Sequence, residues 1–297
     1  MVRRVTAQLR RLQQAIGNCK GQGMNTGRRS WHLKVERADR HLEEVKSAMA
    51  DYATRHPFRA VRATQPKDQR HIWLYRLEMT EEPDPMIPVI IGECLYDLRS
   101  ALDHLAVAMA PRNRRSSAAF PVEWTDPWEK DVTGAFVHAE GRRQSFTSKI
   151  KGMPDEAVKM IKEAQPYMRE HPELETLGLL SSLQNADKHR QLVAIGSGVL
   201  DARSVVTAPV GVIQQPTTGF RPDGKEVAKF GFAGPSPHER EVKVELKGTA
   251  TIALKVGGIE EYFRMPQSLE ILIAWMRDSV IPAFTPFVRA GVSTGNG

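Results

Sequence analysis

Cysteine is almost absent from this chain of 297 residues, which has Cys19 and Cys94 and no Cys-x-x-Cys pair. Two cysteines so far apart in sequence suggest neither a disulfide framework nor a thiolate zinc site. Long apolar runs are also missing, and the longest, MIPVIIG at 86–92, is far shorter than a bilayer span and contains a proline. These absences predict a protein of a reducing, cytoplasmic compartment, with no transmembrane helix and no membrane partner.

Acidic residues are absent from the start of the chain, because none precedes Glu36. Eight of the 42 basic residues lie in 1–35, whereas all 35 acidic residues follow, so the rest of the chain is nearly neutral despite the formal charge of +7. The segment 1–29 lacks the apolar core of a secretory signal and predicts a basic, disordered or loosely helical tail. Met24 is an alternative start to Met1.

Several nucleotide and hydrolase motifs are missing as well. The sequence has no GxxxxGK[ST] phosphate loop, no GxGxxG after a strand and no GxSxG elbow. It also lacks the HExxH pair of zinc proteases. Common nucleotide-driven and hydrolase chemistries are therefore not indicated, and no small-molecule cofactor is expected.

Apolar residues spaced by three to five positions over 31–56 predict an amphipathic helix that ends before Pro57. Two alternating runs, FRAVRAT and HIWLYRLEMT, then flank the polar turn QPKDQR and predict a β-hairpin. A second long helix is expected from about Pro88 to Ala110, where Pro111 closes it. The apolar positions of the first helix are Leu33, Ala38, Leu42, Val45, Met49 and Tyr52.

Two shorter helices are predicted at 154–165 and 172–184, since Pro154 and Pro172 suit a helix start. From Leu192 the chain is rich in Val, Thr and Gly, as in DARSVVTAPVGVI and TATIALKVGG, which indicates short strands in one antiparallel sheet. A helix over 265–284 follows. Its apolar face consists of Leu269, Leu272, Trp275, Met276 and Val280.

These patterns predict an α+β fold with a helical core of four to five helices, an N-terminal β-hairpin and a late antiparallel β layer. The expected divisions are the tail over 1–29, a helical core with the hairpin over 30–192, and a β-rich region closed by the C-terminal helix over 193–297. No internal repeat is present, which argues against a repeat architecture.

The helix over 88–110 carries two faces of different chemistry when it is drawn at about 100° per residue. The apolar seam comprises Ile91, Leu95, Leu98, Leu102, Leu105 and Met109. A second face collects Glu93, Asp97, Ala101, His104 and Ala108, whose small residues allow another element to approach closely. Arg99 and Asp103 lie on the opposite flank at the i, i+4 spacing of a helical ion pair.

The segment RSALDH in this helix has the R-x4-H spacing and resembles the HEPN superfamily of helical proteins. Many members of that superfamily are metal-independent ribonucleases that act as dimers. The resemblance implies that Arg99 contacts the phosphate, that His104 does acid-base work, and that RNA and a second copy of the chain are partners. Arg99 and His104 are about 140° apart on an ideal helix, so they meet at one phosphate if the arginine reaches round or two protomers face each other.

A wider set of motifs, GECLYDLRSALDHLA, FPV, QPY and NADKHRQL, resembles a family of bacterial proteins over about residues 31–192. That resemblance implies no activity. Within NADKHR, Asp187 could orient His189 for proton transfer, while Lys188 and Arg190 could hold a phosphate. Asp97 and Asp103 are the further supporting residues, and the runs PRNRR and GRRQ could attract a nucleic-acid backbone.

Alternatives stay open for every one of these signals. The pair Arg99 and Asp103 could be structural, with His104 satisfied by Asp97 or by a backbone carbonyl, and Asn185 could cap a helix end. The chain would then be a non-catalytic binding or interaction protein. A second alternative is a metal site made of Asp97, His104, Asp187 and His189. Trp124 and Trp128 in FPVEWTDPW could stack bases or form a lid over the helices.

Overall fold

The computed structural model describes residues 29–63, 72–138, 140–171, 175–188, 195–215, 221–233, 238, 241–255 and 262–288. The fold is α+β, as predicted. The chain divides into two compact units, a helical unit (1–42, 90–191 and 267–297) and a sheet unit (43–89 and 192–266). None of the helices in the described ranges has the length and apolar character needed to cross a bilayer.

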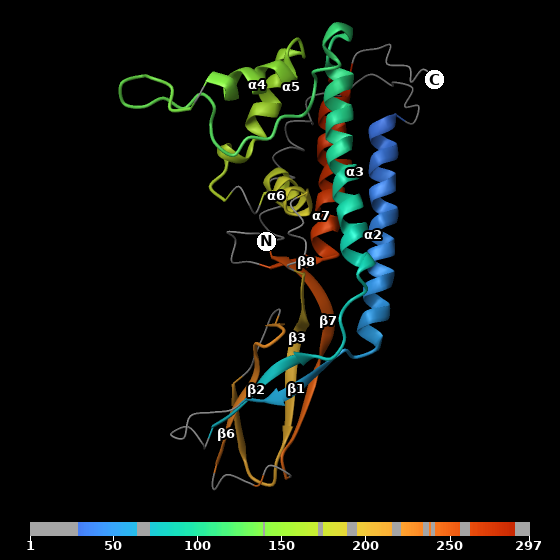
Figure 1. Cartoon of the computed structure of the whole chain (residues 1–297), viewed down its shortest axis with the longest axis vertical. Coiled ribbons are helices and arrows are strands. Elements are labelled where there is room, and N and C mark those ends of the chain that lie inside the picture. The colour runs from blue at the N-terminus through green and yellow to red at the C-terminus, as the bar shows by residue number, and fades with distance from the viewer. Residues whose placement is uncertain are drawn as a thin grey trace. The chain divides into compact units, whose positions relative to one another are not determined.

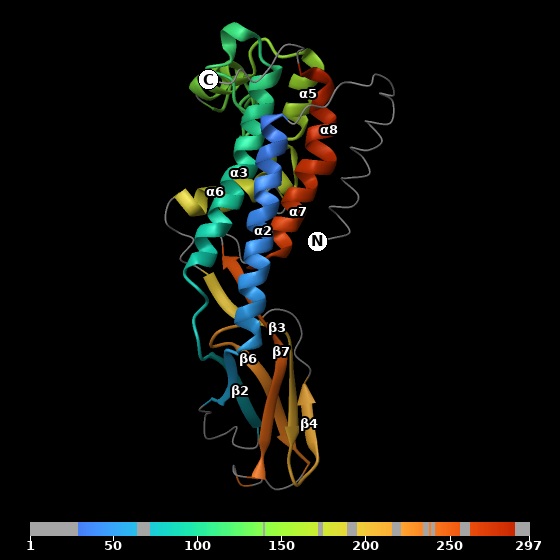
Figure 2. The same cartoon turned by 90° about the vertical axis from the view of Figure 1, so that its right-hand side faces the viewer.

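Two long helices and the shorter α7 form the frame of the helical unit, and α2 continues from Glu43 into the sheet unit. Helices α2, α3 and α7 lie side by side, and α2 runs antiparallel to α3 (Figure 1, Figure 2). The main helices are α2 (Ser30–Thr54), α3 (Met86–Met109), α4 (Glu140–Ile150), α5 (Asp155–Glu163), α6 (Thr176–Lys188), α7 (Gln267–Trp275) and α8 (Ile281–Phe284). Short 3-10 turns lie at η2 (Arg112–Arg114), η3 (Pro166–Met168) and η8 (Thr285–Phe287), and a π-turn lies at η7 (Met276–Val280).

The predicted apolar seam of α3 is the buried core of this helix. All six seam residues are fully buried, because an apolar stripe at helical spacing can be removed from water on one side of the helix. Five of the six apolar positions predicted on α2 are also buried, whereas Leu33 is 47% exposed. Leu33 was predicted to be buried, but it precedes Ala38 by five residues, whereas residues on one face of a helix are three or four apart.

Helix α4 lies in a segment that the sequence left without a predicted helix. Of its eleven residues, Phe146 and Ile150 are buried, so its sequence EGRRQSFTSKI contains one apolar i, i+4 pair and no longer stripe. Helix α5 falls within the predicted range 154–165. Helix α6 begins four residues later than predicted and continues to Lys188, so Asn185 lies inside the helix and does not cap its end.

The C-terminal helix has the predicted apolar face, and all five of its residues are buried. It is not one uniform α-helix, because α7 passes through the π-turn η7 into α8. At this turn the backbone N–H of Ile281 donates to the carbonyl of Met276, one residue further back than in an α-helix. Pro282, which has no backbone N–H to donate, follows immediately.

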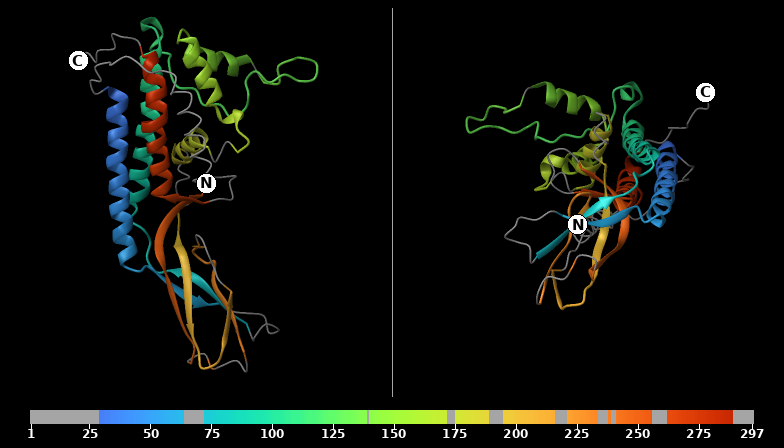
Figure 3. Two further views of the ribbon diagram at one scale, coloured as in Figure 1. Left: turned by 180° about the vertical axis from the view of Figure 1, so that it is seen from behind. Right: turned by 60° about the horizontal axis from the view of Figure 1, so that its bottom comes forward.

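The described residues of the sheet unit form two four-stranded sheets rather than the single late sheet that was expected. The first has the order β1-β2-β6-β4 and the second β5-β3-β7-β8, with antiparallel pairing throughout. Figure 3 shows β3 and β7 side by side along their length. The strands are β1 (Phe58–Arg62), β2 (Ile72–Met79), β3 (Ile195–Thr207), β4 (Val212–Gln215), β5 (Arg221–Pro222), β6 (Glu226–Phe232), β7 (Lys243–Lys255) and β8 (Tyr262–Met265).

The predicted hairpin is present as β1 and β2, but β2 also pairs with β6, a strand more than 140 residues later. Alternate residues Trp73, Tyr75 and Leu77 on β2 are buried, as the period of a strand requires. They pack with residues from β6 and with Val199 on β3 in one apolar cluster. The hairpin therefore shares the core of the late strands, although the sequence division assigned it to the helical core.

Gly248 on β7 lies where β7 closely approaches β3, so a substitution there tests the pairing of these two strands. The residues Asp201 and Ala202 on β3 both lie opposite Gly248 on β7, which makes a β-bulge. A Cβ atom at Gly248 would lie 2.3 Å from Cγ1 of Val199 and 3.0 Å from the carbonyl oxygen of Leu200. We expect Gly248→Ala to lower the free energy of unfolding by about 1–3 kcal/mol, the usual cost of overpacking, in urea denaturation.

Gly141→Ala is the matched control for this substitution. A Cβ at this α4 position meets no atom within 4 Å, and alanine favours a helix by up to about 1 kcal/mol over glycine. We expect Gly141→Ala to leave stability unchanged or slightly raised. Equal losses from the two variants would contradict the close approach at the bulge.

Candidate functional site

Arg99 and Asp103 on α3 hold the backbone of Phe120 from both sides. Arg99 Nη2 donates to the Phe120 carbonyl at 2.6 Å and to Asp103 Oδ1 at 3.0 Å. The same Asp103 oxygen accepts a hydrogen bond from the Phe120 backbone N–H at 2.9 Å. The pair thus satisfies both polar groups of a residue whose side chain is buried, which a buried backbone requires. We call these three residues the Phe120 clamp.

Gln165, from the QPY motif, fixes the next part of the same loop. Its side chain is fully buried. The amide nitrogen donates to the carbonyls of Pro121 and Ile161 at 3.0 and 2.9 Å, and the amide oxygen accepts from the Glu123 N–H at 2.9 Å. Three motifs that are distant in sequence, RSALDH, FPV and QPY, therefore meet at residues 120–123.

Tyr167 completes the QPY motif on the η3 turn. Burial raises the pKa of its hydroxyl to about 12, and the nearby carboxylates of Asp126 and Glu123 add to this increase because they disfavour a phenolate. The hydroxyl is therefore neutral at physiological pH. It does not supply an ionised base beside the loop.

Asp97 lies at the centre of a charged cluster between α2 and α3. Its side chain is 3% exposed and accepts a hydrogen bond from Lys34 Nζ at 2.7 Å. Arg37 Nε and His41 Nε2 lie 3.3 and 3.6 Å from its other carboxylate oxygen, and His41 Nε2 is also 3.6 Å from Glu93. A buried carboxylate needs such cations because its desolvation is costly. The structural alternative gave His104 either Asp97 or a backbone carbonyl as its partner, and Asp97 contacts side chains of α2 instead.

Cys94 lies one turn from Asp97 and is a free, buried thiol. Its Sγ lies 3.5 Å from the carbonyl oxygen of Ala38, to which it donates. Burial, together with the negative charges of Asp97 and Asp39, raises the pKa of the thiol to about 12. The thiolate, the form that attacks substrates or binds metals, is therefore strongly disfavoured.

His104 is half-buried on α3. Within the described part of the chain its side chain makes no hydrogen bond or ion pair, so it is not tied to the Phe120 clamp or to the Asp97 cluster. Arg99, by contrast, is 21% exposed and has its Nη2 in the clamp. The two residues of the R-x4-H spacing thus stand in different surroundings.

The residues predicted from NADKHR contribute less to the described site. Asp187 and Lys188 form the last turn of α6, where the backbone alone is described, and His189 and Arg190 lie outside the described residues. Among the residues that are described, no group of three or more His, Cys, Asp and Glu side chains could hold a metal ion. At Asp97 itself, Lys34 and Arg37 occupy the positions where a cation would bind.

Trp128 behaves as part of a lid over the helices. Its ring packs edge-on against Phe146 of α4 at 5.1 Å between centroids, and Lys162 Nζ of α5 lies 4.6 Å from its centre. Trp124 is 38% exposed and does not share this packing role. Its nearest chain neighbour Thr125 accepts a hydrogen bond from Arg142 of α4.

Four side chains of the site were missed by sequence reasoning, namely Lys34, Arg37, His41 and Gln165. The first three are spaced by three and four residues on one face of a helix that was predicted, and that spacing was the available signal. Gln165 belongs to the QPY motif, which was noted, but no residue of that motif was assigned a role because the motif names no partner. Its partners became evident when the fold placed residues 120–123 beside it.

No family model, curated protein or solved structure matches this chain.

The Phe120 clamp predicts coupled losses of stability. We expect Arg99→Ala and Asp103→Ala each to lower the free energy of unfolding by about 1–3 kcal/mol, because each leaves a polar group of Phe120 without its partner. The double variant should lose less than the sum, by about 1 kcal/mol, since both residues serve one backbone site. Urea denaturation of the four proteins measures this, with the exposed Arg40→Ala on α2 as control. Strict additivity would contradict the clamp.

The Asp97 cluster predicts a separate effect. We expect Asp97→Asn to lower the free energy of unfolding by about 2–4 kcal/mol, somewhat less than a fully buried ion pair because the half-exposed Arg37 can turn to solvent. Glu93→Gln on the same helix is the control. Glu93 is 53% exposed, so its loss should stay within about 1 kcal/mol. Urea denaturation showing equal losses would reject a special role for Asp97.

Proposed function

We propose that this chain is a non-catalytic binding protein in which the RSALDH, FPV and QPY motifs hold the helical unit together. The observation that carries the proposal is the Phe120 clamp, in which one guanidinium nitrogen serves a carbonyl and a carboxylate at once. An arginine that binds substrate phosphate needs its donors directed at the ligand. Nη2 of Arg99 is instead used within the fold.

The electrostatic setting of Arg99 supports the same proposal. Asp103 neutralises the guanidinium at 3.0 Å, and a carboxylate there repels the phosphate that a nuclease must bind. Asp103 has its own structural use, because it accepts the N–H of Phe120. Moving the carboxylate aside for a phosphate would therefore leave a buried backbone donor without its partner.

A metal-independent ribonuclease of the HEPN kind is the second candidate. The observation in its favour is that Nε and Nη1 of Arg99 make no hydrogen bond within the described part of the chain, while the side chain is partly exposed. His104 is partly exposed as well and carries no structural contact there. Arg99 and His104 point away from each other on one helix. They could act on one phosphate if the Arg99 of one copy of the chain faced the His104 of a second copy.

The test is incubation of mixed RNA with the purified full-length chain in EDTA, beside His104→Ala and Arg99→Ala. We expect no cleavage by the wild type, because the clamp commits Nη2 of Arg99 to the fold. Circular dichroism of each protein establishes that the variants are folded. Cleavage by the wild type that folded His104→Ala loses would overturn the proposal and establish the ribonuclease. Cleavage that His104→Ala retains would indicate a contaminating nuclease. The proteins would then be purified further and the assay repeated.

A further inference from the structure

Two segments of the helical unit contain basic residues and no acidic ones. Residues 110–122 and 141–154 together hold seven cations and not one Asp or Glu. Five of the seven are arginines, whose planar fork pairs with phosphate oxygens through two parallel hydrogen bonds. The seven are Arg112, Arg114, Arg115, Arg142, Arg143, Lys149 and Lys151.

The fold joins these two segments, which are about twenty residues apart in sequence. The N–H of Ala119 donates to the carbonyl of Lys149 at 3.3 Å. At the end of α4 the backbone of Gly152 approaches the ring of Pro111 so closely that a Cβ would lie 2.9 Å from Cγ. The η2 turn and the C-terminal end of α4 therefore form one surface, which we call the α4–η2 surface.

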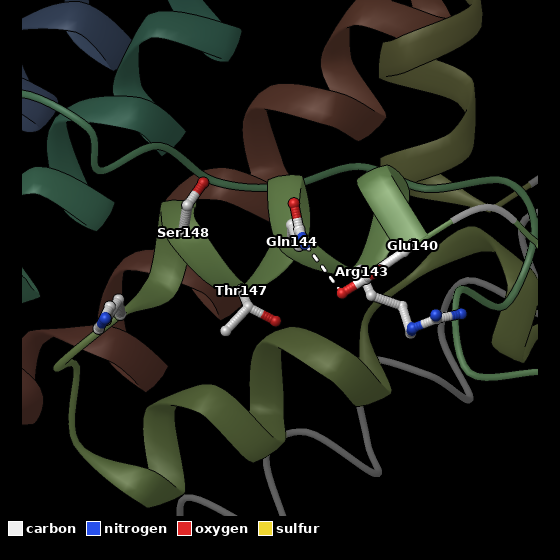
Figure 4. Close-up of a pocket in the computed structure, with 6 residues that line it drawn as sticks. Glu140, Arg143, Gln144, Thr147 and Ser148 are labelled. Carbon is white, nitrogen blue, oxygen red and sulfur yellow. Dashed lines mark hydrogen bonds between the residues drawn. The ribbon is translucent and has the colours of Figure 1, made fainter.

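A shallow hollow runs along the exposed side of α4 (Figure 4). It has a volume of about 320 Å³ and is lined by Glu140, Arg143, Gln144, Thr147, Ser148 and Lys151. The one carboxylate, Glu140, lies one helical turn from Arg143 and accepts a hydrogen bond from Gln144. Between the two cations lie Thr147 and Ser148; the Ser148 hydroxyl donates to the Ser145 carbonyl at 2.9 Å, which leaves the Thr147 hydroxyl to donate to a phosphate oxygen.

The cations are spread along the helix rather than gathered at one point. Arg143 and Lys151 are separated by eight residues, which is about 12 Å along a helix. A single small anion cannot reach both, but consecutive charges of a polymer can. The exposed ring of Trp124 adds a stacking surface nearby, because Thr125 is hydrogen-bonded to Arg142 at 2.8 Å. Aromatic rings beside a basic track are typical of proteins that bind single-stranded nucleic acid.

We infer that the α4–η2 surface binds the phosphodiester backbone of a single-stranded nucleic acid. This inference rests on the proposed binding role and names its ligand class. The surface is separate from Arg99 and His104, and three of its cations are exposed and make no side-chain hydrogen bond or ion pair within the described part of the chain. Arg112, Arg114 and Lys151 are the exposed members best suited to a test, because Arg142 and Arg143 also bind Thr125 and the His138 carbonyl.

The test is the triple variant Arg112→Gln/Arg114→Gln/Lys151→Gln in the full-length chain. Its binding of a fluorescent 20-nucleotide single-stranded RNA is measured by anisotropy over a range of NaCl concentrations. We expect the slope of log K against log salt to become shallower by about 2, since each lost phosphate contact contributes about 0.7 on a single strand. At low salt the affinity should fall at least about tenfold.

The matched control is Arg40→Gln/Lys225→Gln/Lys247→Gln, which removes the same charge from exposed positions elsewhere and should bind like the wild type. The basic segment 1–29 is present in the wild type and in both variants, so it does not contribute to differences in RNA affinity between them. Equal binding by the wild type and the α4–η2 variant would overturn the inference, as would no binding by the wild type. Binding of poly-glutamate as tight as that of RNA would also overturn it and indicate an acidic protein partner.

A gel of the RNA probe after each titration separates this inference from the proposed function. Cleavage of the probe by the wild type that folded His104→Ala loses would overturn the non-catalytic proposal, whatever the affinity. Intact probe with unchanged affinity in the α4–η2 variant would overturn this inference alone. A single-stranded DNA of the same sequence, run in parallel, shows whether the sugar hydroxyl contributes to the interaction.

Discussion

The hydrogen bonds that fix residues 120–123 are the constraint on which the helical unit depends. Arg99 and Asp103 hold Phe120, and Gln165 holds the residues that follow it. This segment leads from the end of α3 toward α4, and Ala119 just before it is bonded to Lys149. Fixing the loop on α3 and α5 therefore also fixes where the η2 turn meets α4. The motif residues Arg99, Asp103 and Gln165 therefore help to position the α4–η2 surface.

Basic side chains in the helical unit differ in what they contact. Lys34 and Arg37 surround the buried carboxylate of Asp97, where a cation compensates for lost hydration. Arg99 is partly covered and serves the backbone. The arginines of η2 are exposed, and Arg112 and Arg114 have no structural contact through their side chains in the described part of the chain. A formal charge of +7 is therefore no guide to ligand binding until each cation has been placed.

Sequence reasoning predicted the elements with strong periodicity and failed where contacts are remote. The seam of α3, the hairpin and the C-terminal apolar face follow from local spacing. Helix α4 was missed because Phe146 and Ile150 are its only buried residues. The pairing of β2 with β6 was missed because strand alternation does not name a partner. At the site, the Arg99 and Asp103 pair followed from i, i+4 spacing, whereas its attachment to Phe120 depends on a loop that no pattern places.

The R-x4-H spacing does not by itself distinguish a phosphate-binding site from a structural contact. An arginine followed four residues later by an aspartate forms an ion pair on its own helix, and that pair can then hold a passing backbone through both of its polar groups. A histidine in the next position is carried about 100° further round the helix and shares none of these contacts. The spacing is therefore satisfied equally by a phosphate site and by a clamp. What separates the two is whether the guanidinium donors are already used, and at Arg99 the Nη2 donor serves both Asp103 and Phe120.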